Sequence, residues 1–260
     1  MPRSSQIWVS YGYREEDVDQ VAAMLGGMFQ VLDAAGGTLA GPWELVTITA
    51  DGLDPAGMVT MPIDLSVLHE MVYQCGCGPD GHPDPRGGLN LVFCTARQPG
   101  EDLAEEGVFI VVQAGLGPGQ ASGVAISGIH GHAPEQVAAH GRDLVTGLAR
   151  ATRADQVTLV SDGRDNDALN IAHEDWVNSR DDPSTAREYP MWGYLNWLVN
   201  DTVANEIDMP GITLTRDGPG TILELDTRDP QQAATVWKSL IDNQLIHPIP
   251  MTQHTPPVFD

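Results

Sequence analysis

The sequence is poor in basic residues, and this scarcity excludes several classes of partner. Its 260 residues contain 13 Lys and Arg against 36 Asp and Glu, which gives a formal charge of −23, and Lys238 is the only lysine. A chain this acidic repels the phosphates of nucleic acids and of anionic lipids, so we expect neither as a partner. The acidity favours either a well-solvated surface or the attraction of a basic partner protein.

Long apolar runs and an export signal are also missing. No run reaches the roughly 20 apolar residues that a membrane-spanning helix needs. The first ten residues lack the basic start and the long apolar stretch of a signal peptide. The three cysteines, Cys75, Cys77 and Cys94, form an odd set that is typical of a reducing compartment. We therefore expect a cytoplasmic protein.

Hydrophobic periodicity predicts a fold that contains both helices and strands. Apolar residues at steps of three and four predict helices over 18–32, 134–148 and 229–241, and Asp64 is placed to cap a shorter helix. Alternating or continuous apolar stretches predict strands over 6–13, 43–50, 89–96, 108–113, 123–129, 157–160, 192–199, 212–215 and 221–225.

Because the strands outnumber the helices and occur in runs, we expect an α+β fold. Its core would be one mixed, largely antiparallel sheet with three or four packed helices. The expectation is a single domain over residues 1–260, and a two-lobed arrangement of about 1–130 and 131–260 is the alternative.

Two short patterns suggest metal binding, but both lack ligands. His130 and His132 would point the same way in a strand and could share a metal, yet their spacing matches no standard metal motif and Gly131 favours a turn. Cys75 and Cys77 have no second pair to complete a four-ligand zinc site.

The segment 162–167 resembles a calcium-binding loop without completing one. It lacks the glycine at the sixth position, and His173 occupies the twelfth position, where a bidentate glutamate belongs. We therefore interpret 162–167 as an ordinary solvated loop, and we predict neither a metal nor a cofactor.

Catalytic motifs are absent as well. Ser127 lacks the glycine spacing of a nucleophile elbow, and the glycines of 115–119 are not followed by the Gly-Lys of a phosphate-binding loop. The residues by themselves therefore identify no catalytic site.

Acidic residues gather in two segments that we predict to contact a partner. The candidate contact residues are Asp162, Asp165, Asp167, Glu174, Asp175, Asp181 and Asp182 in one segment, and Glu101, Asp102, Glu105 and Glu106 in the other. Such surface patches are suited to a basic protein face.

Three stretches of the sequence resemble a known family. Tyr11–Glu16 matches an aromatic-Gly-x-Arg-x-Glu run that leads from a first strand into a helix, and Trp192–Leu198 matches a Gly-aromatic-Leu-x-aromatic-Leu strand. Pro219–Leu225, followed by a helix and Leu245–Pro250, matches a closing module. Together they resemble immunity protein 52, a bacterial immunity family of polymorphic toxin systems, although the Trp-Asn-Gly expected near Val111 is absent.

The resemblance implies a non-enzymatic protein that binds and neutralises a cognate bacterial toxin, often a nuclease, inside the cell. A nuclease site must attract phosphates and is therefore basic. An acidic inhibitor would be attracted to such a site and would occlude it. The alternatives are a small cytosolic metal-dependent hydrolase that uses His130 and His132, and a scaffold or self-assembling protein.

Overall fold

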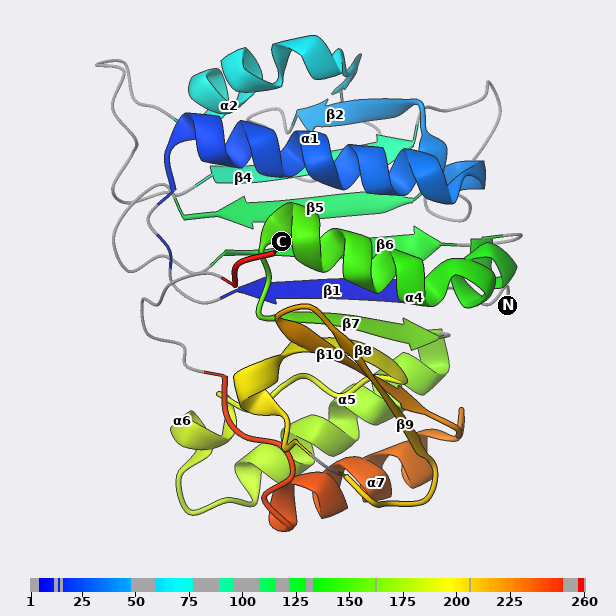
Figure 1. The fold of residues 1–260 in the computed structure, drawn as a ribbon. Coiled ribbons are helices and arrows are strands. Elements are labelled where there is room, and N and C mark those ends of the chain that lie inside the picture. The colour runs from blue at the N-terminus through cyan, green and yellow to red at the C-terminus, as the bar shows by residue number, and fades with distance from the viewer. Residues whose placement is uncertain are drawn as a thin grey trace.

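The described strands form one 10-stranded sheet with β1 near its middle (Figure 1). The computed structural model describes residues 5–11, 14, 16–47, 59–76, 89–95, 108–115, 122–129, 133–161, 163–205, 207–249 and 257–259. The strand order is β3-β2-β4-β5-β6-β1-β7-β8-β10-β9, and every neighbouring pair is antiparallel. The strands are β1 (Ser5–Tyr11), β2 (Trp43–Thr47), β3 (Val59–Pro62), β4 (Leu89–Thr95), β5 (Phe109–Ala114), β6 (Ser122–Ile129), β7 (Gln156–Ser161), β8 (Leu195–Val199), β9 (Ile212–Asp217) and β10 (Gly220–Leu225). The expected α+β class with a largely antiparallel sheet is confirmed.

The described residues contain six α-helices, where the sequence pattern predicted three or four. They are α1 (Val18–Ala35), α2 (Leu68–Gly76), α4 (Ala133–Thr152), α5 (Gly163–Asn178), α6 (Pro183–Ala186) and α7 (Pro230–Asp242), with 3-10 turns η1 (Gly37–Ala40), η3 (Leu65–Val67) and η4 (Asn200–Thr202). None of the helices in this part of the chain is both long and apolar enough to cross a membrane.

The predicted helix starts are formed by aspartate side chains. Asp17 accepts a hydrogen bond from the backbone of Gln20, whose side chain in turn accepts one from the backbone of Asp17, which closes a capping box at α1. Asp64 caps the 3-10 turn that runs into α2. Asp229 caps α7 ahead of Pro230, so the helix starts read from the sequence are confirmed at these three places.

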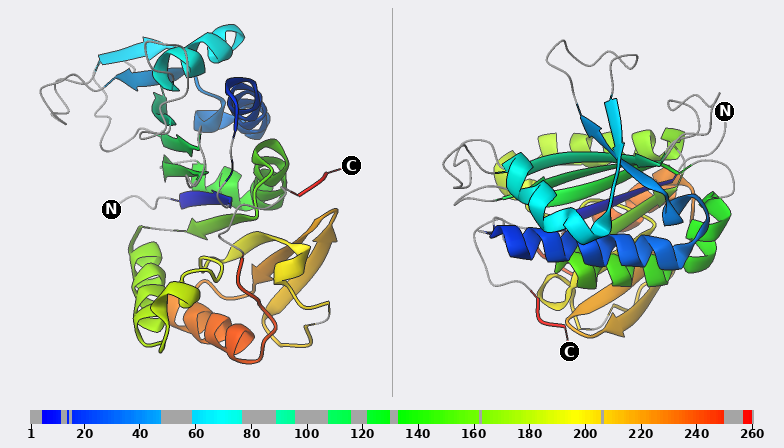
Figure 2. Two further views of the ribbon diagram at one scale, coloured as in Figure 1. Left: turned by 90° about the vertical axis from the view of Figure 1, so that its left-hand side faces the viewer. Right: turned by 90° about the horizontal axis from the view of Figure 1, so that it is seen from above.

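The helices cover the two faces of the sheet at different ends. Figure 2 shows α1 and α4 side by side on one face, and α5 with α7 on the opposite face beside the β7–β9 end. The β1 strand pairs with β6 on one side and with β7 on the other. Strands that precede and follow residue 130 in the sequence therefore belong to one sheet.

Two hydrophobic cores follow from this arrangement because alternate strand residues face opposite sides. In β8, Trp197 belongs to the core under α1 and α4, while Leu198 belongs to the core under α5 and α7. In β10, Ile222 and Leu223 divide in the same way. The strands β7, β8 and β10 are therefore buried on both faces, whereas the edge strand β9 keeps alternate residues exposed.

The prediction of a solvated loop at 162–167 is wrong for the residues that are described. Residues 163–167 form the first turns of α5, and Asp162 lies outside the described residues. The acidic character of the segment concealed a helical stripe of apolar residues, in which Leu169, Trp176 and Val177 are buried. The burial of that stripe against the sheet decides the conformation over the local preference of Gly, Asp and Asn for turns.

Gly220 is the position at which the packing of the seam between β10 and β8 is tightest. A Cβ atom there would lie 2.2 Å from ring carbons of Trp197, which is fully buried and stacks on Phe259 with ring centroids 5.4 Å apart. We expect Gly220→Ala to lower the free energy of unfolding by about 1–3 kcal/mol through overpacking, as measured by urea denaturation.

The matched control is Gly26→Ala in α1. Its Cβ would make only an ordinary contact of 3.8 Å with Leu68, and alanine favours the helix, so we expect stability to be unchanged or about 0.5–1 kcal/mol higher. Wild-type stability of Gly220→Ala would contradict the packing described for Trp197.

Candidate protein interface

The predicted contact residues fall into three groups in the structure. Glu174 and Asp175 lie exposed near the end of α5, and Asp181 and Asp182 lie exposed in the turn that leads to α6. Asp165 and Asp167 belong to the start of α5, and their side chains are not described. The other five candidate contact acids lie outside the described residues: Asp162, Glu101, Asp102, Glu105 and Glu106. The candidate metal ligands His130, His132 and Cys77 lie outside them too. The structure thus brings four of the predicted acids together, around the end of α5.

The α5 helix has a sharply divided surface. Its inner stripe of Leu169, Trp176 and Val177 is buried, while Ala168 and Ile171 are exposed on the outer side. Ile171 is 61% exposed, which is unusual for a large apolar side chain at the middle of a helix. The outer side of α5 therefore combines acidic residues with one prominent apolar residue.

The turn between α5 and α6 is fixed by Asp182. Its carboxylate caps α6, accepting hydrogen bonds from the hydroxyls of Ser184 and Thr185 and from their backbone N–H groups. The Ser184 and Thr185 hydroxyl bonds lower the pKa of Asp182 to about 2, because they stabilise the ionised form. Asp182 therefore keeps its negative charge at every pH at which the protein would act.

The acids at this surface are only partly neutralised by arginines. Arg187 approaches Glu174 with 3.4 Å between Nη2 and Oε2, and both side chains are more than half exposed. Arg180 pairs with Asp242 at 2.8 Å and lies over the ring of Trp176. Exposed pairs of this kind stabilise a fold by about 1 kcal/mol at most. Asp175 and Asp181 form no ion pair with any described residue, so this surface keeps a negative balance.

A group of packed aromatic rings lies beneath the buried side of α5. Trp176 lies 5.8 Å from Trp192 and 5.5 Å from Tyr189 between ring centroids, and Trp192 stacks in parallel on Trp237 of α7 at 6.5 Å. The indole of Trp237 donates a hydrogen bond of 3.0 Å to the carbonyl of Gly193. These rings join α5 to α7, and they give the exposed side of α5 a rigid base.

His173 lies within these rings, and its environment favours the neutral imidazole. Its ring is 5.1 Å from Trp192 and 6.1 Å from Trp176, and Nε2 is buried without a hydrogen-bond partner among the described residues. Burial lowers the pKa of His173 below its ordinary value; Glu174 opposes this effect and Arg187 adds to it.

Folding is therefore expected to become less favourable as the pH falls. Because the pKa of His173 is lower in the folded state, the unfolded chain takes up the proton first, and stability falls as the pH drops from 7 through about 6.5 toward 5. We expect His173→Phe, which keeps a ring in the stack, to reduce this pH dependence in urea denaturation at pH 7 and pH 5. The same pH dependence in both proteins would contradict this assignment.

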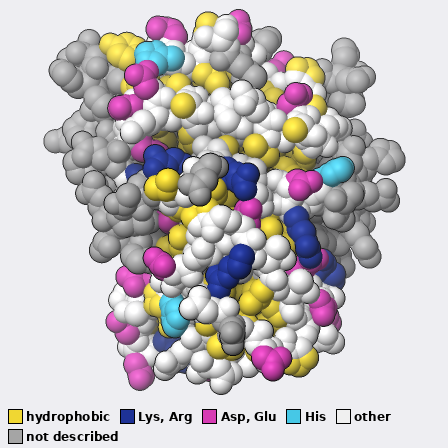
Figure 3. All heavy atoms as spheres, viewed as in Figure 1, with side chains coloured by type: hydrophobic (Ala, Val, Ile, Leu, Met, Phe, Trp, Pro, Cys, Tyr) yellow, Lys and Arg dark blue, Asp and Glu magenta, His cyan; other side chains and the backbone are white. Residues whose placement is uncertain are grey.

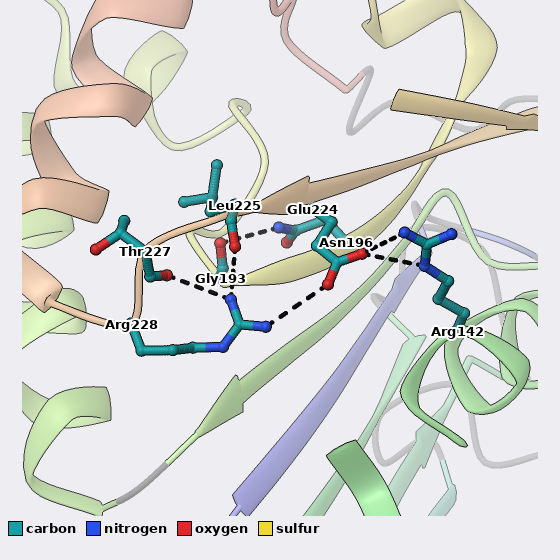
Figure 4. A network of polar contacts seen from close by, with 7 residues as sticks. All are labelled: Arg142, Gly193, Asn196, Glu224, Leu225, Thr227 and Arg228. Atoms are coloured by element: carbon teal, nitrogen blue, oxygen red, sulfur yellow. Dashed lines mark hydrogen bonds and ion pairs between the residues drawn. The ribbon is translucent and has the colours of Figure 1, made fainter. Parts of the chain in front are cut away.

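The opposite face of the molecule carries a different polar surface. Figure 3 shows basic side chains gathered over the middle of this face, around α4 and the β9–β10 hairpin. Arg142 of α4 forms two hydrogen bonds with Glu224 of β10, at 2.6 and 3.0 Å, and Arg228 also approaches Glu224 at 3.7 Å (Figure 4). Arg150 of α4 forms a hydrogen bond of 3.0 Å with Asp217, the last residue of β9. Arg142 and Arg150 join α4 to the hairpin, while Arg228 pairs with Glu224 within one segment, so all three charges are used within the fold.

No group of three His, Cys, Asp or Glu side chains in the described parts of the chain is arranged to hold a metal ion. Cys75 is exposed on α2, and Cys94 is buried in β4. His130 and His132 lie outside the described residues, so the metal-dependent alternative stays an untested prediction.

Comparison with known proteins supports the fold. A search of solved structures finds the Pseudomonas aeruginosa T6SS protein PA0821, which aligns over 98% of this chain and 78% of its own, with a TM-score of 0.52 and 11% sequence identity. At this identity the likeness concerns the fold alone. No family model matches the sequence, and no curated protein matches it.

Sequence reasoning missed Ile171 and the aromatic base beneath it. The spacing of Leu169, Ala172, Trp176 and Val177 is a helical signal that the surrounding acids obscured. Nothing in the sequence distinguishes Ile171 from these neighbours as the exposed residue, because only the docking of α5 decides which side is buried.

Proposed function

We propose that this chain is a non-enzymatic immunity protein that binds a cognate bacterial toxin and neutralises it by occluding its active site. The observation that carries the proposal is the outer side of α5, where an exposed isoleucine lies among acidic residues on a rigid aromatic base. Interfaces combine an apolar centre with a polar rim in this way.

Two further observations support the proposal. The chain shares its fold with the Pseudomonas aeruginosa T6SS protein PA0821, and a T6SS-associated neighbour fits a toxin-immunity role. The sequence motifs resemble immunity protein 52 over both ends of the chain. We propose that the toxin is a nuclease, since a phosphate-binding site is basic and attracts an acidic inhibitor, and that the encounter takes place in the cytoplasm.

The test is a titration of a purified toxin domain, which the proposal expects to be encoded beside this chain. The purified domain is incubated with nucleic acid and increasing amounts of this protein, and complex formation is followed by size-exclusion chromatography. We expect a stable complex and full loss of nuclease activity at an equimolar ratio. Full toxin activity in the presence of excess protein, without a complex, would overturn the proposal.

A further inference from the structure

We infer that the outer face of α5, centred on Ile171, is the surface that binds the partner, and that the partner presents a basic protein face with an apolar depression. This inference rests on the proposed function and adds to it the surface and the residue that anchors the complex.

The outer face of α5 is a continuous stripe on one side of the helix. Its exposed members are Ala168, Ile171, Asp175 and Asn178, spaced at three, four and three residues. Residues at this spacing line one side of a helix. Ile171 stands at the middle of the described stripe, with one small residue before it and polar residues after it.

The Ile171 side chain contributes little to the stability of the fold. Its side chain is 61% exposed, and the inner stripe supplies the burial that holds α5 on the sheet. The other large apolar residues exposed in the described parts of the chain are Val67, Tyr73 and Val258, and none of them lies on α5. Ile171 is therefore a free apolar group that a partner can desolvate.

The backbone beneath Ile171 is held firmly before any partner arrives. Trp176 and Val177 follow Ile171 by more than one helical turn, and both are buried. Trp176 contacts the rings of Trp192 and Tyr189. A surface that is already ordered loses little conformational entropy on binding, which favours affinity.

The charges around Ile171 select the kind of partner. Asp175 lies one turn after it without an ion pair to any described residue, and Asp181 and Asp182 continue the acidic surface toward α6. Residues 163–188 contain seven acids and three arginines. A second copy of this chain, with its charge of −23, would be repelled, so the occupant is a different protein with a basic face.

The experiment measures binding kinetics against the same purified toxin domain that the proposed function expects beside this chain. The variant Ile171→Asp removes the apolar group while adding a charge of the same sign as its surroundings. We expect its affinity to fall roughly thirtyfold, as for an interface hot spot. The loss should come from a faster dissociation rate. Asp175→Lys is expected instead to slow association at low salt, and less so at high salt.

Val67→Asp is the matched control, because Val67 is also exposed but lies in the 3-10 turn before α2, at the other end of the sheet. We expect it to bind like the wild type. Ile171→Ala, which preserves helix propensity, is expected to weaken binding in the same direction as Ile171→Asp, and thermal unfolding of each variant confirms its fold.

The outcomes separate the inference from the proposed function. If the wild type binds the toxin and Ile171→Asp and Ile171→Ala bind equally well, the α5 surface is wrong and the proposed function stands. If the wild type forms no complex and gives no inhibition, the proposed function is wrong and the docking surface with it.

Discussion

Replacing Arg14 by methionine is expected to lower the free energy of unfolding by about 3–5 kcal/mol, because a buried ion pair would be broken and two backbone carbonyls would lose their donor. Arg14 is 5% exposed, and its Nη2 lies 3.9 Å from the carboxylate of Asp155, which is 1% exposed as a residue. Nη1 donates a hydrogen bond of 3.0 Å to the carbonyl of Thr152, the last residue of α4, and Nη2 donates to that of Arg153, which follows the helix. The measurement is equilibrium urea denaturation at pH 7.

The double variant Arg14→Met with Asp155→Asn provides the control for this prediction. It removes both charges, so we expect it to be more stable than Arg14→Met alone, with a coupling energy of about 1–3 kcal/mol in the double-mutant cycle. Strict additivity of the two single variants would show that the pair is not coupled. Arg14 belongs to the Tyr11–Glu16 motif, and the structure assigns it a role in packing β1 against α4.

Replacing Trp237 by alanine is expected to lower the free energy of unfolding by about 3–5 kcal/mol. Trp237 is fully buried in α7, stacks on Trp192, and donates its indole N–H to Gly193. The carbonyl of Gly193 also accepts a hydrogen bond from Asn196, so the loss would come mainly from the cavity. Chemical denaturation gives the magnitude.

Hydrogen exchange shows where the Trp237 variant is weakened. Because α5 packs on α7 through the aromatic rings, we expect amides of α5 to exchange faster in Trp237→Ala, while those of α1 stay protected. Trp237→Phe keeps much of the ring volume and is expected to lose less stability than Trp237→Ala. A loss below 1 kcal/mol in the alanine variant would contradict the packing described for the second core.

The elements that sequence analysis predicted well are those with one clear apolar face. The helix α1, capped by Asp17, follows from a regular stripe ending at Leu32, and the structure buries that stripe from Val21 to Leu32. The strands predicted over 212–215 and 221–225 are apolar runs that flank Arg216–Pro219, and in the structure they pair with each other as the β9–β10 hairpin. In both cases the local pattern and the tertiary packing agree.

The elements that sequence analysis missed have weak or conflicting local signals. The α5 helix opens with Gly, Asp and Asn, which favour turns, and its apolar stripe becomes helical when it packs on β7 and α7. The strand predicted over 192–199 begins at Leu195, because Trp192 and Tyr194 fill the core beside Trp237 before the chain enters the sheet.

The sequence by itself determined the charge, the α+β class, the capped helix starts and the presence of an acidic segment at 162–182. Composition and periodicity are local properties, and they suffice for these features. Only the tertiary structure decided that this segment is mainly a helix, which acids it keeps together, and that Ile171 faces outward. The reason is physical: exposure and proximity depend on which side of α5 the sheet and α7 cover, and those elements lie far away in the sequence.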